Sequence, residues 1–196
     1  MPVGRDKVAA DFPDHPFWDF SLRVYGSDGV PAACLVLQER YEIDVNVLLY
    51  CCWLGASGRG ALDGGEIARV CETVAEWHRD VVRGVRAVRQ RLKGGLGAAP
   101  LELSEPLRRR IAKIEVDLEH VEQLMLAGSL VREADAGRGE ADRLADALDN
   151  CGAFFAAAGI APDAADAAET AAILGPAFAG LPAASVAAAA RARLVA

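Results

Sequence analysis

The residues of this sequence whose side chains could bind a ligand concentrate near the N-terminus, where aromatic rings alternate with hydrogen-bonding groups. Ligand pockets combine apolar walls with a few polar groups in this way, so a small-molecule pocket is one prediction. The candidate pocket residues are Trp18, Arg23, Tyr25, Asn46, Tyr50 and Trp53, together with His78 at the border of a later apolar stripe. The other interpretation is that the large rings are core residues whose polar ends reach the surface.

A block of basic residues is the second candidate site. Residues 77–114 hold 10 basic and 3 acidic residues, although the whole chain has a formal net charge of −7. A local positive field of this kind can attract an acidic protein surface, which we favour as a partner, or RNA. The candidate partner-binding residues are Arg79, Arg83, Arg86, Lys93, Arg108 and Arg109. The alternative is a solvated face that acidic residues partly neutralise.

Motifs for catalysis and for metal binding are not found in the sequence. The three histidines lack the Glu-x-x-His and His-Glu-x-x-His spacings of common metal sites, so we expect neither a metal site nor a cofactor. The segment 55–58, Gly-Ala-Ser-Gly, lacks the spacing of a nucleophile elbow. The five cysteines show no Cys-x-x-Cys pair and are interpreted as reduced, buried thiols. We therefore predict no catalytic residue and favour a non-enzymatic protein.

The composition predicts helices rather than strands. Alanine occurs 39 times and threonine twice, a balance that favours helix formation and disfavours sheets. Three short helices are predicted at about 14–26, 31–41 and 44–55. Residues 43–47 alternate as a strand would, but no second strand-like run exists to pair with them, so we interpret Asp44 as the N-cap of a helix.

Two longer helices are expected to form the centre of the fold. Apolar residues recur at helical spacing over about 63–93, with Trp77 in the middle of the stripe, and again in a helix that Ser104 caps. The connection is short and glycine-rich, which predicts an antiparallel hairpin. A further helix is expected at about 140–158. The predicted fold class is therefore all-α: a helical bundle built on a long antiparallel helix hairpin with three short N-terminal helices.

We assign residues 1–158 to a single helical domain. Residues 159–196 are rich in alanine and are predicted to form a tail or short helices that are loosely held and dispensable for folding. The uncharged stretch 170–190 is interrupted by glycine and proline, so no membrane span is expected. The first residues contain no apolar signal-peptide region, which together with the reduced thiols favours a cytoplasmic location.

The N-terminal region carries a family resemblance. The segments Phe-Trp-Asp-Phe-Ser-Leu-Arg-Val-Tyr at 17–25, Gly-Val at 29–30, Cys-Leu-Val-Leu-Gln at 34–38 and Asp-Val-Asn-Val-Leu-Leu-Tyr-Cys-Cys-Trp at 44–53 form a characteristic series. With them the sequence resembles a bacterial family of uncharacterised all-helical proteins, a domain of unknown function. The match is good over about 16–93 and weaker to about 126. The resemblance implies a small cytoplasmic bacterial protein and supplies no catalytic residues.

Three functional hypotheses follow from these patterns. A cytoplasmic interaction module or adaptor is favoured, because no catalytic motif is found. A small-molecule-binding protein or enzyme would use the N-terminal aromatic and polar residues. An RNA- or ribosome-associated factor would use the basic end of the hairpin.

Overall fold

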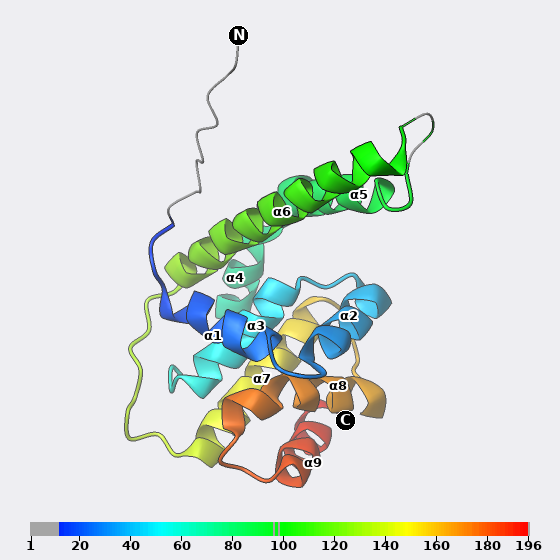
Figure 1. The fold of residues 1–196 in the computed structure, drawn as a ribbon. Helices are drawn as coiled ribbons and strands as arrows, with labels where there is room; N and C mark the ends of the chain where they lie inside the picture. The colour runs from blue at the N-terminus through cyan, green and yellow to red at the C-terminus, as the bar shows by residue number, and fades with distance from the viewer. Residues whose placement is uncertain (1–11, 96, 98, 196) are drawn as a thin grey trace.

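The regular elements of the protein are helices, as the composition predicts. The structure, a computed structural model, describes residues 12–95, 97 and 99–195; the expectation about a signal peptide in the first residues lies outside this part. Figure 1 shows the arrangement of the helices. The α-helices are α1 (Pro16–Tyr25), α2 (Val30–Tyr41), α3 (Val45–Ala56), α4 (Gly64–Glu76), α5 (Arg83–Arg91), α6 (Leu101–Ser129), α7 (Glu140–Ala157), α8 (Ala164–Leu174) and α9 (Ala183–Leu194). A π-helical turn, η1 (Trp77–Val82), joins α4 to α5, and a 3-10 turn, η2 (Gly175–Phe178), follows α8.

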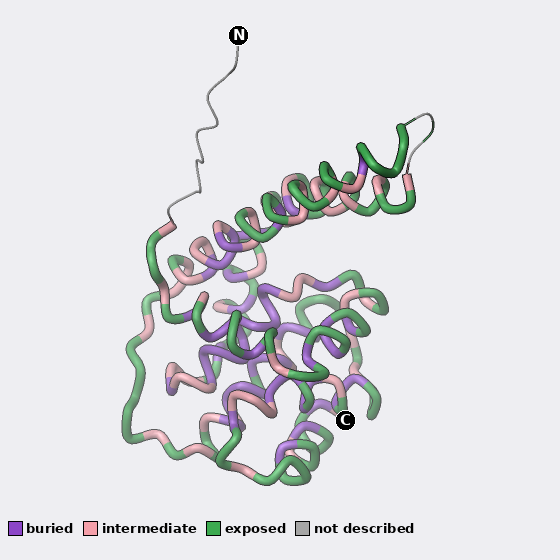
Figure 2. The backbone as a smooth tube through the Cα atoms, in the orientation of Figure 1, coloured by how far each residue is buried: buried purple, intermediate pink, exposed green. Residues whose placement is uncertain are grey.

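Helix α3 lies at the centre of the molecule and is buried on every side (Figure 2). The predicted cap is confirmed: the Asp44 side chain accepts a hydrogen bond from the Asn46 backbone N–H and begins the helix. The main neighbour of α3 is α7. The two backbones approach so closely at Gly55 that a Cβ atom there would lie 2.2 Å from the Ala147 nitrogen. Only glycine permits this approach, and it brings the apolar faces of both helices into one core.

The C-terminal segment adopts the short helices that were one of the two predicted alternatives. Helix α8 contacts α2, and α9 contacts α7 and α8. The largest apolar side chains of this segment, including Ile173, Leu174 and Phe178, are buried in the same core as α3. This burial argues against the expected loose attachment, because each of these side chains removes apolar surface from water.

The predicted start of the second long helix is wrong. Helix α6 begins at Leu101 after Pro100, and Ser104 lies within its first turn, where its hydroxyl donates to the Leu101 carbonyl instead of capping. Proline tolerates the position before a helix and carries no N–H that would need a partner there. The apolar residues expected to form a buried seam are only partly covered: Ile114 is 50% exposed and Leu107 is 47% exposed.

Helices α5 and α6 lie side by side and project from the rest of the bundle (Figure 1). The Trp77 indole N–H donates to the Leu118 carbonyl, and further along the chain Arg86 and Arg89 bind Glu115. The projection leaves both helices without a covering layer on their outer side, which explains the exposure of the expected seam. None of the helices within the described residues has the length and apolar character needed to cross a membrane.

Candidate functional site

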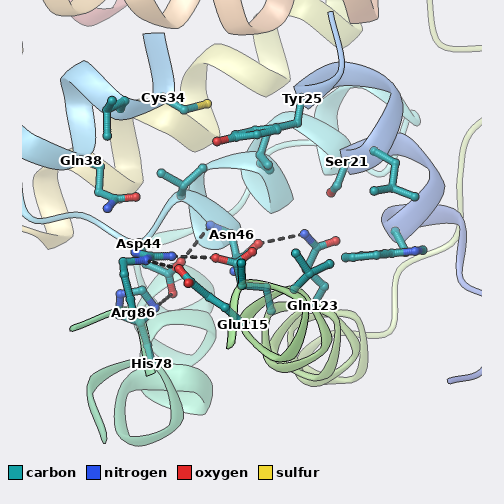
Figure 3. A pocket seen from close by; sticks show the side chains of 18 of the residues that line it. Ser21, Tyr25, Cys34, Gln38, Asp44, Asn46, His78, Arg86, Glu115 and Gln123 are labelled. Carbon is teal, nitrogen blue, oxygen red and sulfur yellow. Dashed lines mark hydrogen bonds and ion pairs between the residues drawn. The ribbon is translucent and has the colours of Figure 1, made fainter. Parts of the chain in front are cut away.

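A cavity of about 390 Å³ lies where the projecting helices α5 and α6 join the bundle. Figure 3 shows Ser21, Tyr25, Cys34 and Gln38 on one side of this space and His78, Arg86, Glu115 and Gln123 on the other. The volume lies within the range of small-molecule pockets. The full lining consists of Trp18, Ser21, Leu22, Tyr25, Cys34, Leu35, Gln38, Asp44, Val45, Asn46, Leu49, His78, Arg86, Arg89, Gln90, Ala112, Glu115, Val116, Glu119 and Gln123.

The two walls of the cavity differ in chemistry. Helices α1, α2 and α3 contribute mainly rings and aliphatic side chains, such as Trp18, Leu22 and Leu49. The Trp18 ring is held by His120 of α6, which stacks on it with ring centroids 3.9 Å apart. The opposite wall, from η1, α5 and α6, carries most of the charged side chains. The cavity is therefore suited to a ligand with one apolar and one polar end.

Three titratable side chains meet at the polar end. His78 Nδ1 lies 3.1 Å from Asp44 Oδ2 and 3.1 Å from Glu122 Oε1. Asp44 precedes α3, His78 belongs to η1, and Glu122 belongs to α6, so the cluster joins three separate elements. The π-helical turn that holds His78 is a helix irregularity of the kind found often at functional sites.

Asn46 and Gln123 fix the orientation of the two carboxylates. The Asn46 side-chain amide donates to Glu122 Oε2 over 2.6 Å, and the Asn46 backbone N–H donates to Asp44 Oδ1 over 2.8 Å. Gln123 in turn donates to the Asn46 side-chain oxygen over 2.8 Å. One oxygen of each carboxylate is therefore held by Asn46, and the other oxygen of each faces His78.

The surroundings change the acidity of the cluster. Burial, and next the negative charge of Glu122, raise the pKa of Asp44 to about 7, against the opposing effect of His78. Burial acts to lower the pKa of His78, but the hydrogen bond to Glu122 and the charge of Asp44 outweigh it, so the pKa is raised. The pKa of Asp44 thus lies near neutrality and that of His78 lies above its ordinary value, and shifted pKa values of this kind are frequent at functional sites.

A second group of charges occupies the α5–α6 wall. Arg86 donates to Glu115 over 2.8 Å and to Glu119 over 2.6 Å, and Arg89 also binds Glu115. Burial acts to raise the pKa of Glu115, but the hydrogen bonds from Arg89 and Arg86 lower it. Burial raises the pKa of Glu119, and the nearby Arg86 only partly offsets this. Both arginines are therefore engaged by carboxylates of the same chain.

Three of the six buried side-chain polar atoms that lack a hydrogen-bond partner in the described part of the chain belong to residues lining this cavity. Ser21 and Gln123 are 3% and 4% exposed, and neither Ser21 Oγ nor Gln123 Oε1 makes a hydrogen bond there. Asp44 Oδ2 touches His78 but likewise accepts no hydrogen bond. Buried polar atoms are nearly always bonded, so their concentration around one cavity indicates a place where a ligand supplies the missing partners.

The structure brings together four of the seven predicted pocket residues: Trp18, Tyr25, Asn46 and His78 line the cavity. The other three lie elsewhere. Tyr50 is fully buried, and its ring packs against those of Phe17 and Trp53, so both Tyr50 and Trp53 are core residues. Arg23 is exposed and donates to the Pro176 carbonyl.

The predicted partner-binding bases are mostly paired within the chain. Arg79 binds Asp80, Arg83 binds Glu42, and Arg108 and Arg109 both bind Glu105. Lys93 is exposed at the end of the projection. Arg86, also predicted to bind a partner, lines the cavity and binds Glu115 and Glu119.

Sequence reasoning missed the carboxylates that complete the site. Glu115, Glu119, Glu122 and Gln123 are spaced like one face of a helix, which is a visible signal. A polar stripe of this kind normally indicates a solvated face, and only the position of α6 against α3 shows that it is buried. Cys34 also lines the cavity, but burial raises the pKa of its thiol to about 12, so it is not an activated nucleophile.

The described residues form an all-α fold with a cavity, and the titratable cluster at its polar end joins the residue before α3 to η1 and α6. Residues 16–126 match the family described as "Protein of unknown function (DUF2390)", and because this span covers more than half of the chain, the protein belongs to that family. The matched span contains every residue that lines the cavity. No curated protein and no solved structure matches the chain.

Proposed function

We propose that this protein binds a small amphipathic molecule that carries a hydrogen-bond donor, such as an amine, in the cavity between α1, α2 and α6. The observation that carries this proposal is the pair of buried polar atoms without a partner among the described residues, Ser21 Oγ and Gln123 Oε1, in the wall of one cavity. A bound molecule that satisfies both atoms removes a desolvation cost of about 1–3 kcal/mol for each.

The chemistry of the ligand follows from what the cavity leaves unpaired. Gln123 Oε1 is an acceptor only, and the cavity arginines, Arg86 and Arg89, are already bound to Glu115. A ligand that donates hydrogen bonds therefore fits better than an anion. The apolar part of such a molecule would contact the Trp18 ring and the aliphatic side chains beside it.

A fragment series tests this function directly. Benzylamine and phenethylamine, compared with the alcohols and carboxylic acids of the same skeleton, would be titrated into the full chain and followed by thermal shift and calorimetry. We expect the amines to raise the melting temperature and the carboxylic acids to have no effect. Equal or better binding of the carboxylic acids would contradict the proposed ligand class.

A pair of matched variants locates the binding site. Ala112 lines the cavity and Ala75 is an exposed residue of α4, so Ala112→Phe fills the cavity while Ala75→Phe adds the same ring elsewhere. We expect Ala112→Phe to weaken amine binding by at least about tenfold and Ala75→Phe to leave it unchanged. Undiminished binding to a folded Ala112→Phe variant would place the fragments outside this cavity.

The projecting hairpin of α5 and α6 supports a second candidate function, the interaction module that the sequence favours. An apolar groove between these helices is lined by Val81, Val85, Val88, Ile111 and Ile114, with Asp80 and Gly84. The exposed bases Lys93, Arg110 and Lys113 lie on the same two-helix projection. An acidic amphipathic helix of a partner protein would match both the groove and the charge.

Charge reversal away from the cavity tests this second function. Lys93→Glu, Arg110→Glu and Lys113→Glu would be combined in one variant, since each of these side chains is exposed. A partner that binds through the hairpin should dissociate faster from this variant, and the effect should shrink as salt is added. A captured partner that binds the triple variant and the wild type equally at low salt would contradict this function.

A further inference from the structure

We propose that Asp44, His78 and Glu122 form a binding site for a divalent transition-metal ion, for which Zn²⁺ is the natural probe. One potential ligand atom of each residue, Asp44 Oδ2, His78 Nδ1 and Glu122 Oε1, lies within 4.8 Å of the other two. Imidazole nitrogen and carboxylate oxygen are the ligand types that such ions accept together.

The hydrogen bonding of the cluster points to an ion. Both carboxylate oxygens approach the same atom, His78 Nδ1, at 3.1 Å, yet that nitrogen carries at most one hydrogen. A single proton cannot serve both oxygens well, and Asp44 Oδ2 accepts no hydrogen bond within the described residues. A cation placed between the three atoms would contact all of them.

The distances fit such an ion with little movement. Zinc–nitrogen and zinc–oxygen bonds of about 2.0–2.1 Å in a tetrahedral site place neighbouring ligand atoms roughly 3.3 Å apart. The two separations at His78 Nδ1 are both 3.1 Å. The two pairs that include His78 Nδ1 therefore need to move apart by only a few tenths of an ångström, and the two carboxylate oxygens lie within 4.8 Å of each other.

The residues around the cluster hold the ligands as a metal site requires. Asn46 donates to the outer oxygen of each carboxylate, and Gln123 fixes Asn46. Outer partners of this kind orient metal ligands and hold the inner oxygens towards the ion. Figure 3 shows Asp44, Asn46, His78 and Gln123 of this arrangement. Glu122 and Gln123 are buried and Asn46 is 8% exposed, so the arrangement is built into the core rather than formed by mobile surface groups.

The proposed ion would border the cavity. Asp44 and His78 line the cavity, whereas Glu122 is fully buried and is not part of the lining. Three protein ligands leave a fourth position open, as in catalytic rather than structural zinc sites. The metal site goes beyond the small-molecule function proposed above and does not depend on it, because the ion uses atoms other than Ser21 Oγ and Gln123 Oε1.

Titration of the metal-free full chain tests the proposal. The chain would be treated with a chelator, dialysed, and titrated with ZnCl₂ and MnCl₂ by calorimetry, and its melting temperature would be measured with and without each ion. We expect saturable binding of one ion per chain and a higher melting temperature in its presence. Absence of saturable binding of both ions would overturn the proposal and leave the cluster as a hydrogen-bonded network.

Two glutamates of α6 give a matched pair of variants. Glu122→Gln removes the ligand charge but keeps the size and the acceptor for Asn46, whereas Glu105→Gln makes the same change beside Arg108, far along the helix. We expect the first variant to lose more than about 100-fold in Zn²⁺ affinity and the second to bind as the wild type. Unchanged affinity of a folded Glu122→Gln variant would overturn the proposal.

Two further measurements distinguish this cluster from metal binding elsewhere in the chain. Asn46→Ala removes the outer support, and its affinity should fall about 10–100-fold. Co²⁺ in place of Zn²⁺ reports the ligand type, because thiolate ligands give strong near-ultraviolet charge-transfer bands. The free cysteines, among them the half-buried Cys71, would produce these bands. A cobalt spectrum without them is expected, and strong thiolate bands would overturn the assignment to this cluster.

Discussion

The interface of α3 with α7 and the buried face of α6 differ in composition although both lie inside the protein. The region around α3 and α7 is mainly apolar, with Leu48, Leu54, Leu148 and Phe155 each no more than 1% exposed. Its buried polar residue Asn150 donates to the Cys51 carbonyl of α3. The buried face of α6 is almost entirely polar: its buried residues are Ser104, Glu115, His120, Glu122, Gln123 and Leu126. Only one of the six is aliphatic.

The difference indicates that the two regions serve different purposes. Apolar burial stabilises a fold with no need for partners, whereas each buried carboxylate or amide costs free energy unless it is paired. A chain that buries several polar groups along one helix gains less stability there than apolar residues would provide. The polar face of α6 lies against the cavity, which is where such groups can act on a ligand or an ion.

The largest effect on stability should come from removing a whole segment of the apolar region. Deleting residues 159–196 removes Ile173, Leu174 and Phe178, all at most 2% exposed, and uncovers the core beneath them. The sequence pattern predicts that the chain without these residues still folds. Because the deleted side chains are buried, we expect the opposite. The truncated chain should lose its cooperative thermal transition, measured by circular dichroism. A sharp transition at an unchanged temperature would show that this segment is dispensable.

A single substitution in the same region should have the next largest effect. Phe155 of α7 is fully buried, so Phe155→Ala should lower the free energy of unfolding by about 3–5 kcal/mol, measured by urea denaturation. Leu103→Ala on α6 is the control, because that side chain is 70% exposed and should change the value by less than about 0.5 kcal/mol. Similar losses of unfolding free energy for both variants would contradict the proposal that the apolar region, and not the outer side of α6, stabilises the fold.

The apolar region is also the part that sequence reasoning predicted well. The helix cap at Asp44, the helix that follows it and the helix at 140–157 match the structure closely, because capping and apolar spacing are local signals. The start of α6 was missed, since Ser104 resembles a cap but Pro100 precedes the helix. The π-helical turn at 77–82 was missed as well, because steps of three and four residues do not distinguish it from a regular helix.

The polar site could be predicted only in part. The residue types predict Asn46 and His78 as pocket residues, as found, whereas the sequence predicts Asp44 only as a helix cap. The helical spacing of Glu122 with its polar neighbours does not identify its partners, Asn46 and His78, which are 76 and 44 residues away in the sequence. A cluster formed by three elements depends on how the elements pack, and local spacing carries no information about that packing.

Substitution of Trp77 tests how much a partly buried ring contributes to stability. The sequence pattern places this ring in the middle of an apolar stripe and predicts a loss of about 3–5 kcal/mol for Trp77→Ala. The ring is only half-buried, with its N–H bonded to the Leu118 carbonyl over 3.1 Å. We therefore expect a smaller loss of about 1–3 kcal/mol by urea denaturation. Trp77→Phe keeps an aromatic ring at this position and should therefore lose less free energy of unfolding than Trp77→Ala. A loss above about 3 kcal/mol for Trp77→Ala would mean that the ring behaves as a core residue.

The smallest effect on stability should come from the exposed basic residues of α6. Arg109 and Arg108 both donate to Glu105, and these hydrogen bonds lower the pKa of the Glu105 carboxyl to about 2. Arg109 is 74% exposed, and exposed pairs of this kind contribute little because water and salt screen them. Arg109→Ala should therefore shift the melting temperature by less than about 2 °C.

The same variant should still change the acidity of its partner. Loss of one of two donors favours the protonated form of Glu105, so its pKa should rise towards the ordinary range, measured by NMR titration of the carboxyl carbon. Arg86→Ala is the comparison, because Arg86 is 16% exposed and binds the buried Glu115, and its loss should lower the melting temperature several times more. If Arg109→Ala destabilises the protein as much as Arg86→Ala, the exposed end of α6 contributes to the fold as its buried polar face does.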